Sequence, residues 1–411
     1  MSLLDVIAVI ISLTAIFSFA NYHTLRLPNT IGVMLIALVM SLLILLAGSI
    51  FEPVHDHALT LLNSIDFNRT LMDGMLSFLL FAGALHVNLN DLSKEKGVIA
   101  VLATVGVVTS TFIVGGLSWM LFDLLGIQIS LGYCLLFGAL ISPTDPIAVL
   151  GILKKAGVPK SLETKIIGES LFNDGVGVVV FLALFGIVTA NQETDSGAIA
   201  WLFVTEVIGG GLMGLVLGGI AYSMLRRIDS YQVEVLITLA LVMGGYALAN
   251  SLHLSGPIVM VVGGLLIGNH GRRLAMSDKT REHLDTFWKL IDEVLNAVLF
   301  VLIGLEVMVL TTDVTSWVAA LIMIPLVLMA RLVCVAVPVS IMKLKRDFSP
   351  NAIKIMTWGG LRGGISVALA LSLPLGAERD TLLIATYAVV IFSIVVQGLT
   401  IQRLVNSSSE N

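Results

Sequence analysis

The chain has 411 residues, of which 57% are hydrophobic and only 12% charged, and its formal net charge is -5. Soluble domains carry nearer one quarter charged residues, so this composition excludes a soluble surface and makes the lipid bilayer the solvent. No P-loop, complete G-x-G-x-x-G or Cys/His ligand spacing is present, which argues against nucleotide and zinc sites. Cys134 and Cys334 lie in apolar runs and are interpreted as buried small hydrophobic residues.

Apolar stretches bounded by polar or Gly/Pro-marked turns predict an all-α polytopic membrane protein with thirteen transmembrane helices. The first stretch has an acidic flank and no clear cleavage site, so we expect a retained helix rather than a signal peptide. The predicted spans are 3–20, 30–50, 70–87, 98–123, 130–153, 164–190, 199–225, 231–251, 255–269, 284–310, 316–342, 350–374 and 381–402.

The loop charges predict an N-terminus outside the membrane and a C-terminus in the cytoplasm. In that orientation 18 of the 23 Lys and Arg residues fall in cytoplasmic segments, and only Arg69 and Arg379 fall on the opposite side. This asymmetry is what the positive-inside rule predicts. The tail after the last span is short, so residues 1–411 are expected to form a single membrane domain with no soluble domain.

Two predicted spans contain residues that interrupt helices. Pro143 and Pro146 flank Thr144 and Asp145 in span five, and each proline removes a backbone donor. Four glycines surround the Leu361-Arg362 pair in span twelve. A simple kink is the alternative for either span taken alone, since Gly and Pro are common in membrane helices.

The positions of the two interrupted spans favour a functional break. Spans five and twelve run in opposite directions, as expected if residues of about 1–190 and about 231–404 form inverted six-helix repeats joined by a linker span at about 199–225. Discontinuous helices in corresponding positions of inverted halves are a pointer to a transporter's binding site.

Span six carries four polar residues in its first half: Glu169, Ser170, Asn173 and Asp174. The pairs 169/173 and 170/174 are spaced i,i+4, so all four lie on one face of the helix. A charged side chain facing lipid costs on the order of 3 kcal/mol. This face is therefore expected to point toward protein or water.

Depth along the helices brings further charged residues to the same layer. With a rise of 1.5 Å per residue, Asp145, Asp174, Arg331 and Arg362 lie roughly 12–18 Å from their span ends. Carboxylate, hydroxyl, amide and freed carbonyl oxygens are hard ligands that suit a small alkali cation. Because burial disfavours a charged carboxylate, one aspartate can hold a proton or a cation in turn, and alternating access then gives exchange.

Other roles stay open for several of these residues. A structural hydrogen bond is the alternative for Asp174, and compensation of helix dipoles is the alternative for Asp145. Glu169 is predicted to pair with an arginine, preferably Arg331, while Arg362 is expected to neutralise carbonyls of its own broken helix, although the opposite assignment is open.

One polar group lies near the start of span ten. Lys289 and Glu293 are spaced i,i+4, with Asp292 beside them, and are interpreted as an interfacial salt bridge.

Two segments carry a family resemblance: SPTDPIAVLGILKKAGVPKSLETKIIGESLFNDGVGVVVF and WGGLRGGISVALALSLP. Their T-D, E-S-x-x-N-D and G-L-R-G motifs resemble the sodium/proton antiporter family of the NhaP and NHE type, and the similarity covers essentially the whole membrane domain. The resemblance implies an NhaA-like fold of inverted repeats, with crossed discontinuous helices at spans five and twelve, and a working homodimer in the cell (inner) membrane.

The resemblance also implies residue roles. Asp174 is implied as the residue that binds the ion and carries the proton, and Ser170, Thr144 and Asp145 as helpers that coordinate the Na+. Asn173, which precedes the key aspartate, implies an electroneutral exchange of one cation for one proton.

The same resemblance implies that Glu169 pairs with an arginine, carried over to Arg331. It further implies that Na+ or Li+ and protons are the substrates, and no enzyme activity, cofactor or nucleic-acid partner is expected.

Three alternatives to a Na+ (or Li+)/H+ antiporter with an elevator-like core are weighed. A K+/H+ antiporter of the same fold is the nearest alternative, because the ligand types in the sequence do not distinguish cations of such similar radii. A passive cation channel requires a continuous pore, which one broken-helix pair with a titratable group fits less well. An intramembrane aspartyl protease requires a G-x-G-D context that neither Asp145 nor Asp174 has.

Overall fold

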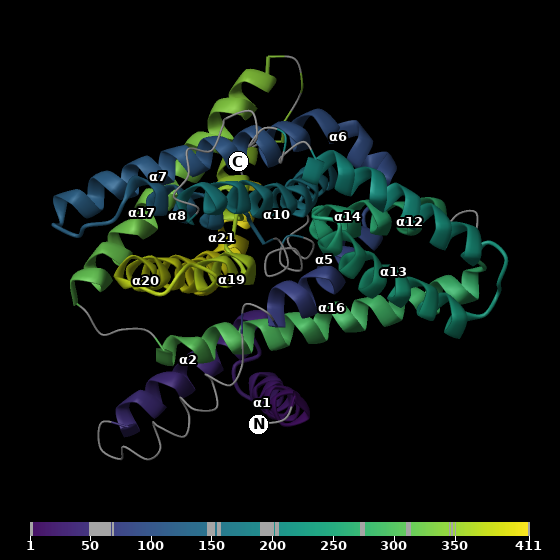
Figure 1. Ribbon diagram of the computed structural model, residues 1–411, viewed down its shortest axis with the longest axis horizontal. Coiled ribbons are helices and arrows are strands. Elements are labelled where there is room, and N and C mark those ends of the chain that lie inside the picture. The colour runs from purple at the N-terminus through teal and green to yellow at the C-terminus, as the bar shows by residue number, and fades with distance from the viewer. Residues whose placement is uncertain are drawn as a thin grey trace.

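A computed structural model gives the architecture of the chain, in which all the described secondary-structure elements are helices (Figure 1). The structure describes residues 3–48, 67, 70–145, 153, 158–189, 201, 205–271, 276–309, 314–344, 346, 348–349 and 351–409. The helices are α1 (Leu3–His23), α2 (Asn29–Gly48), η1 (Thr70–Met75), α5 (Leu76–Leu85), α6 (Leu89–Val101), η2 (Leu102–Gly106), α7 (Val107–Leu124), α8 (Leu131–Ile141), α10 (Lys160–Thr189), η3 (Thr205–Gly209), α12 (Gly210–Leu225), α13 (Tyr231–Ser251), α14 (Gly256–Leu266), η4 (Ile267–Gly271), α16 (Asp278–Glu306), η5 (Val307–Val309), α17 (Val314–Met342), α18 (Ala352–Trp358), α19 (Gly364–Leu371), α20 (Ala377–Phe392), η6 (Ser393–Gln397) and α21 (Gly398–Ser409).

The prediction of an all-α membrane protein is confirmed. Eight of the described helices are long and apolar enough to cross a bilayer, and shorter apolar helices accompany them at 70–85, 131–141 and 256–271. Each of the thirteen predicted ranges contains described helical residues. The number of helices that cross the membrane and the division into inverted repeats stay predictions.

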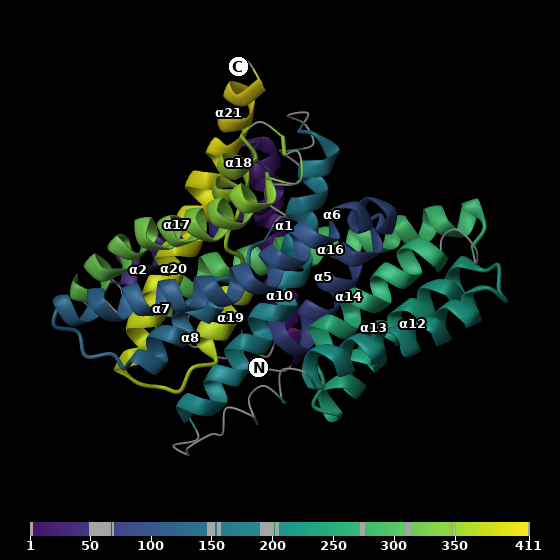
Figure 2. The same ribbon diagram turned by 90° about the horizontal axis from the view of Figure 1, so that it is seen from above.

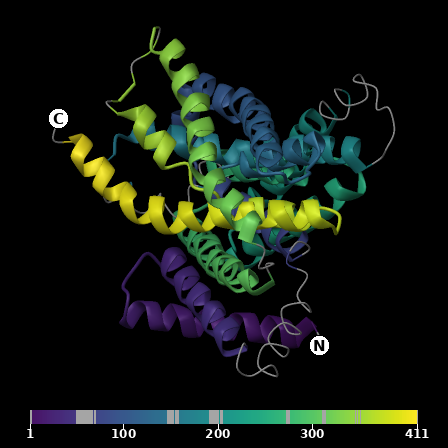
Figure 3. The same cartoon turned by 90° about the vertical axis from the view of Figure 1, so that its left-hand side faces the viewer.

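Helix α16 runs through the middle of the assembly. On one of its sides it packs against α1 and α2, and on the other against α5, α13 and α19, which places the two N-terminal helices apart from the rest in Figure 3. Helices α12 and α13 lie on the right in Figures 1 and 2, whereas α7, α8, α17 and α20 lie on the left. Helices α5, α10 and α19 occupy the region between these two groups.

Polar side chains inside the helices satisfy their hydrogen bonds locally, as a medium without water requires. Ser130 and Ser277 cap the first turns of α8 and α16 by accepting from the backbone N–H groups of Tyr133 and Thr280. Further along, buried hydroxyls donate to the carbonyl four residues earlier, as Thr386 does to Leu382 at 2.7 Å. These hydroxyls therefore find their partners within their own helices.

Helices α5 and α14 pack backbone against backbone because glycines face α5. A methyl group on Gly264 would stand 2.9 Å from the carbonyl oxygen of Phe81, and one on Gly268 would stand 2.1 Å from that of Leu85. Neither position has space for a side chain. The backbones of α14 and of the following η4 thus approach α5 closely at these two glycines.

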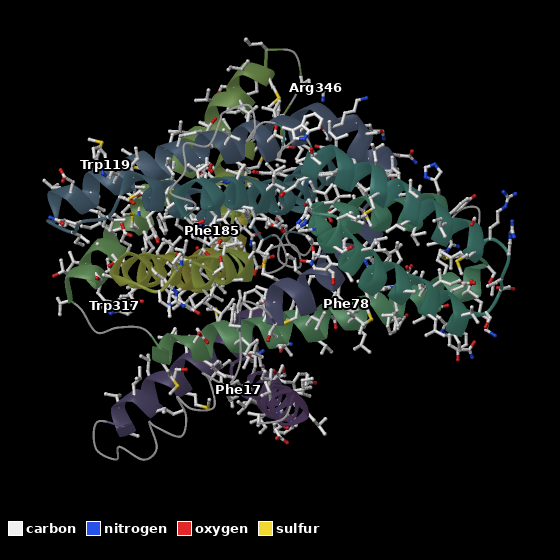
Figure 4. The ribbon with its side chains drawn as sticks, viewed as in Figure 1. Phe17, Phe78, Trp119, Phe185, Trp317 and Arg346 are labelled. Carbon is white, nitrogen blue, oxygen red and sulfur yellow. The ribbon has the colours of Figure 1, made fainter. Side chains whose placement is uncertain are left out.

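An aromatic cluster joins α5 to α16. The ring of Trp288 lies 4.7 Å from that of Phe81 and 6.1 Å from that of Phe78, which is labelled beside α16 in Figure 4. The indole N–H of Trp288 donates to the Thr238 hydroxyl of α13 at 3.0 Å, so this buried ring satisfies its polar atom as well. Both cysteines are free and buried, as predicted from the sequence.

Candidate functional site

The first element of the site is the end of α8. This helix stops at Ile141, and the described residues from Pro143 to Asp145 are not helical. Pro143 has no backbone donor and cannot continue the helix. Pro146, the second predicted breaker, lies outside the described residues.

The second element is the gap between α18 and α19. Helix α18 ends at Trp358, α19 begins at Gly364, and the glycine-rich segment between them is not helical. The two unwound segments meet directly, because the backbone N–H of Asp145 donates to the carbonyl of Leu361 at 2.8 Å. A methyl group on Gly363 would stand 2.6 Å from Oδ2 of Asp145. The two predicted breaks therefore face each other in space.

Helix α10 contributes the polar face that the sequence predicts. Asn173 is buried, and its amide binds Thr144 twice: Nδ2 donates to the hydroxyl at 2.9 Å and Oδ1 accepts from the backbone N–H at 3.2 Å. The hydroxyl of buried Ser170 donates to the carbonyl oxygen of Thr144. The unwound end of α8 is thereby fastened to α10.

Asp174 and Asp145 are half-buried and line one cavity of about 630 Å³. Ser170 and Thr144 line it too. The arrangement brings a carboxylate from a helix and a carboxylate from an unwound segment to the same wall, with a hydroxyl from each beside them. Such a set of hard oxygen donors suits a small cation.

The cavity opens at one end. Its lining includes Lys289 and Glu293, whose side chains are 71% and 64% exposed, and exposed His86. Leu71 and Leu76, also in the lining, are 1% exposed and belong to its buried part. Among the described lining residues, four carboxylates stand against one lysine ammonium, so the cavity attracts cations.

Glu169 points away from the cavity and pairs with Arg331 of α17. Both carboxylate oxygens accept from the guanidinium, the second at 3.0 Å, and Arg331 also donates to the carbonyl of Met356 at 3.2 Å. Both residues are buried. A methyl group on Gly360 would stand 2.7 Å from Nε of Arg331, so the ion pair supports α10, α17 and the end of α18 together.

Arg362 takes a position that differs from the sequence-based expectation. Its guanidinium donates to the carbonyls of Ser142 and Pro143, the latter at 3.0 Å, and not to carbonyls of its own broken helix. These are the carbonyls left unpaired where α8 ends, and a buried cation there offsets the negative end of the helix dipole. Each broken helix is thus stabilised by a residue of the other.

Two residues of the cavity wall were not predicted from the sequence to belong to the site: Asp292 was assigned to an interfacial salt-bridge group, and Asn296 was not named. Asp292 and Asn296 of α16 line the cavity, and the Asn296 amide donates to the Asp292 carboxylate at 3.0 Å. The Lys289–Glu293 contact predicted beside them is present at 3.9 Å. The signal that could have identified them is their i,i+4 spacing inside an apolar span.

Comparisons with known proteins give the family. The family described as "Sodium/hydrogen exchanger, transmembrane" matches residues 9–407. The Na(+)/H(+) antiporter NhaP of Pseudomonas aeruginosa is 53% identical over 408 residues, which are 98% of this chain and 96% of that protein. The Na(+)/H(+) antiporter NhaH of Halobacillus dabanensis is 36% identical over 386 residues, with 93% of this chain and 92% of the relative covered.

A solved structure shares the fold. The sodium proton antiporter MjNhaP1 from Methanocaldococcus jannaschii at pH 8 superposes with a TM-score of 0.70 at 18% identity, covering 93% of this chain and 99% of that one. The resemblance stated from the T-D, E-S-x-x-N-D and G-L-R-G motifs is therefore confirmed. The chain belongs to the sodium/hydrogen exchanger family, a family of membrane transporters and not of enzymes.

Proposed function

We propose that this protein exchanges Na+ or Li+ for H+ across the membrane, with Asp174 binding the cation and the proton in turn. The observation that carries the proposal is the position of Asp174, which lines an open cavity beside the two unwound segments. The names of the related antiporters from Pseudomonas aeruginosa and Halobacillus dabanensis support sodium as the cation.

Four oxygen-bearing side chains are the proposed cation ligands: Asp174, Ser170, Thr144 and Asp145. Ser170 uses its proton to bind the Thr144 carbonyl, so its oxygen lone pairs are free to face a cation. When no cation is bound, a proton on Asp174 removes the cost of a bare carboxylate at this half-buried position. The cation and the proton therefore compete for Asp174, and either of them neutralises the charge of its carboxylate.

The proposed stoichiometry rests on the family resemblance, in which an asparagine before the key aspartate implies exchange of one cation for one proton. Asn173 carries no charge and is engaged with Thr144, so it adds no second acid beside Asp174. Each passage then carries one positive charge in either direction, and the exchange of one cation for one proton is electroneutral.

Alternating access is proposed to move the broken helices as one body, in an elevator-like displacement. The Asp145–Leu361 backbone bond and the Arg362 contacts to α8 tie the two unwound segments together, and Asn173 ties them to α10. The cavity opens at the end where Lys289 and Glu293 lie. Since the loop charges put that end in the cytoplasm, this conformation is proposed to face inward.

The remaining proposals rest on the resemblance and the loop charges. They are a homodimer, an N-terminus outside, the inverted repeats of about 1–190 and 231–404 joined by the span at about 199–225, and the absence of a cofactor. A K+/H+ exchanger of the same fold is the second candidate, because hard oxygen donors alone do not select between these cations.

The test uses purified protein in liposomes with a trapped pH-sensitive dye, with Na+, Li+ or K+ added between pH 6 and 9. Wild type is expected to move protons in response to Na+ or Li+ at a clamped membrane potential, and Asp174→Asn to lose this response. Asp123→Asn, which removes an exposed carboxylate of α7, is the matched control.

Three results would redirect the proposal. If Asp174→Asn exchanges as fast as wild type, the shared site lies elsewhere and Asp145 is tested next. A response to K+ alone selects the second candidate. A passive conductance without coupled proton movement favours a channel.

A further inference from the structure

A stripe of polar residues follows one face of α16 along the cavity. Lys289, Asp292, Glu293 and Asn296 all line the cavity, and their spacing of three and four residues puts them on one side of the helix. The next cavity residue on this face is Leu299, against which a methyl group on Gly364 would collide at 2.4 Å. The stripe therefore leads to the start of the broken helix α19.

Exposure falls steeply along this stripe. The side chains of Lys289 and Glu293 are 71% and 64% exposed, whereas Asn296 is 1% exposed. Seven residues separate Lys289 from Asn296, which is about 10 Å along a helix. An ion that enters the open end meets Asp292 and Asn296 within the wall before it reaches the deeper part of the cavity.

Asn296 holds an unused acceptor. Its Nδ2 donates to the carbonyl of Asp292 at 2.8 Å and to the Asp292 carboxylate at 3.0 Å, and this carboxylate contact fixes which end of the amide carries the nitrogen. Its Oδ1 is buried and accepts no hydrogen bond from the described residues. Leaving such an acceptor unsatisfied is unfavourable because its lost hydration is not replaced, and buried polar atoms of this kind call for a ligand.

The electrostatic surroundings favour a cation as that ligand. The carboxylates of Asp145 and Glu293 line the same cavity as Asp292 and carry the same charge, so a cation between them lowers their mutual repulsion. The nearest described cation on this face, Lys289, is turned to Glu293 at 3.9 Å. Two neighbouring oxygen donors of one helix cannot supply the six to eight ligands of Ca²⁺; they suit a monovalent ion that keeps part of its water shell.

We propose that the Asp292 carboxylate and Oδ1 of Asn296 form an accessory site for a hydrated alkali cation. The site holds the cation on its way to Asp174 and so sets the apparent affinity for transport from the open side. This inference rests on the proposed cation exchange.

The kinetic test measures initial rates of Na+-driven proton movement in liposomes over a range of Na+ concentrations. Asp292→Asn and Asn296→Leu are each expected to raise the KM for Na+, on the order of tenfold for the lost carboxylate, with little change in the maximal rate. Asp292→Glu is expected to keep a KM near that of wild type. Glu293→Gln, at the exposed end of the same stripe, is the matched control.

The accessory site is contradicted if Asp292→Asn and Asn296→Leu lower the maximal rate and leave the KM for Na+ unchanged. It is also contradicted if their KM equals that of Glu293→Gln. Such a result leaves the exchange itself in place, as long as wild type and Asp174→Asn differ. If wild type shows no Na+-driven proton movement, the proposed function itself is contradicted.

A second measurement does not depend on transport. Thermal unfolding of the purified protein is compared in NaCl and in choline chloride of equal concentration, in the Asp174→Asn background. Residual stabilisation by Na+, which disappears when Asp292→Asn is added, supports the accessory site, because only a ligand bound to the folded state raises stability. Absence of any residual Na+ effect in Asp174→Asn contradicts it.

Discussion

Asn173 and Thr144 are joined by two hydrogen bonds that use the amide nitrogen and the amide oxygen of one side chain. Asn173, the residue before Asp174, therefore holds the unwound end of α8 against α10. A carboxylate in its place could accept both bonds only if the Thr144 hydroxyl reversed to become a donor, and it would bring a second charge into a buried position. The neutral amide satisfies both partners without that charge.

Replacing Asn173 with alanine is expected to destabilise the fold and to weaken Na+ binding. The Thr144 N–H would lose its acceptor while buried, at a cost of about 1–3 kcal/mol, and the segment that carries Asp145 would loosen. Thermal unfolding and the Na+ dependence of proton movement measure the two effects. Thr144→Ser keeps the hydroxyl and is the control, so an equal loss in both variants would contradict the proposed fastening role.

Breaking the Glu169–Arg331 pair is expected to be costly from either side. Both residues are buried, and removal of one partner from a buried ion pair costs about 3–5 kcal/mol because the other charge stays uncompensated. Glu169→Gln and Arg331→Met should each lower the temperature of unfolding, and the double substitution should recover part of the loss. Additive losses in this double-mutant cycle would mean that the two side chains are not energetically coupled.

Gly363→Ala is expected to abolish exchange. The backbone at Gly363 is extended, with φ of -116°, so any residue could adopt it; the obstacle is the methyl group, which would stand 2.6 Å from the Asp145 carboxylate. Gly186→Ala, on α10 where nothing lies within 4 Å, should leave exchange intact. Normal proton movement in Gly363→Ala would show that Asp145 can be displaced without loss of function.

The Na+ dependence of exchange is expected to vary with pH in one direction. If a proton and a cation share Asp174, acidification raises the KM for Na+, by up to about tenfold per pH unit where one proton is displaced, and saturating Na+ restores the rate at moderate acidity. Initial rates between pH 6 and 9 test this. A KM that is constant over that range would separate the proton site from the cation site.

Much of the architecture can be predicted from the sequence because the bilayer restricts the chain so strongly. Every backbone group must bond within a helix, so the apolar runs mark the helices and the Pro143 and Gly363 regions mark the breaks. The hydrogen-bond partners of Arg331 and Arg362 were harder to predict. Arg331 stands in a helix without breaks and meets Glu169, but Arg362 donates across to the other broken helix, a contact that depends on how the helices cross and that spacing along one chain does not encode.

Asp292 and Asn296 show the other limit of sequence reasoning. In the sequence they stand next to Lys289 and Glu293, and an interfacial salt bridge explains all the charges of this segment. The difference lies in burial: within seven residues of one helix the face passes from open solvent to a closed wall. This gradient depends on the packing of α5 and α19 against α16, which only the three-dimensional arrangement supplies.

The contact between α5 and α14 bears on how the cavity can change shape. Five cavity residues belong to α5, namely Leu76, Leu79, Leu80, Ala82 and Gly83. Behind this helix Gly264 of α14 and Gly268 of η4 lie against its backbone, so α5 has little room to recede at these two positions. This wall of the cavity therefore has little space behind it. In the proposed exchange, we expect the change of cavity shape to involve the opposite wall, where α10 carries Asp174.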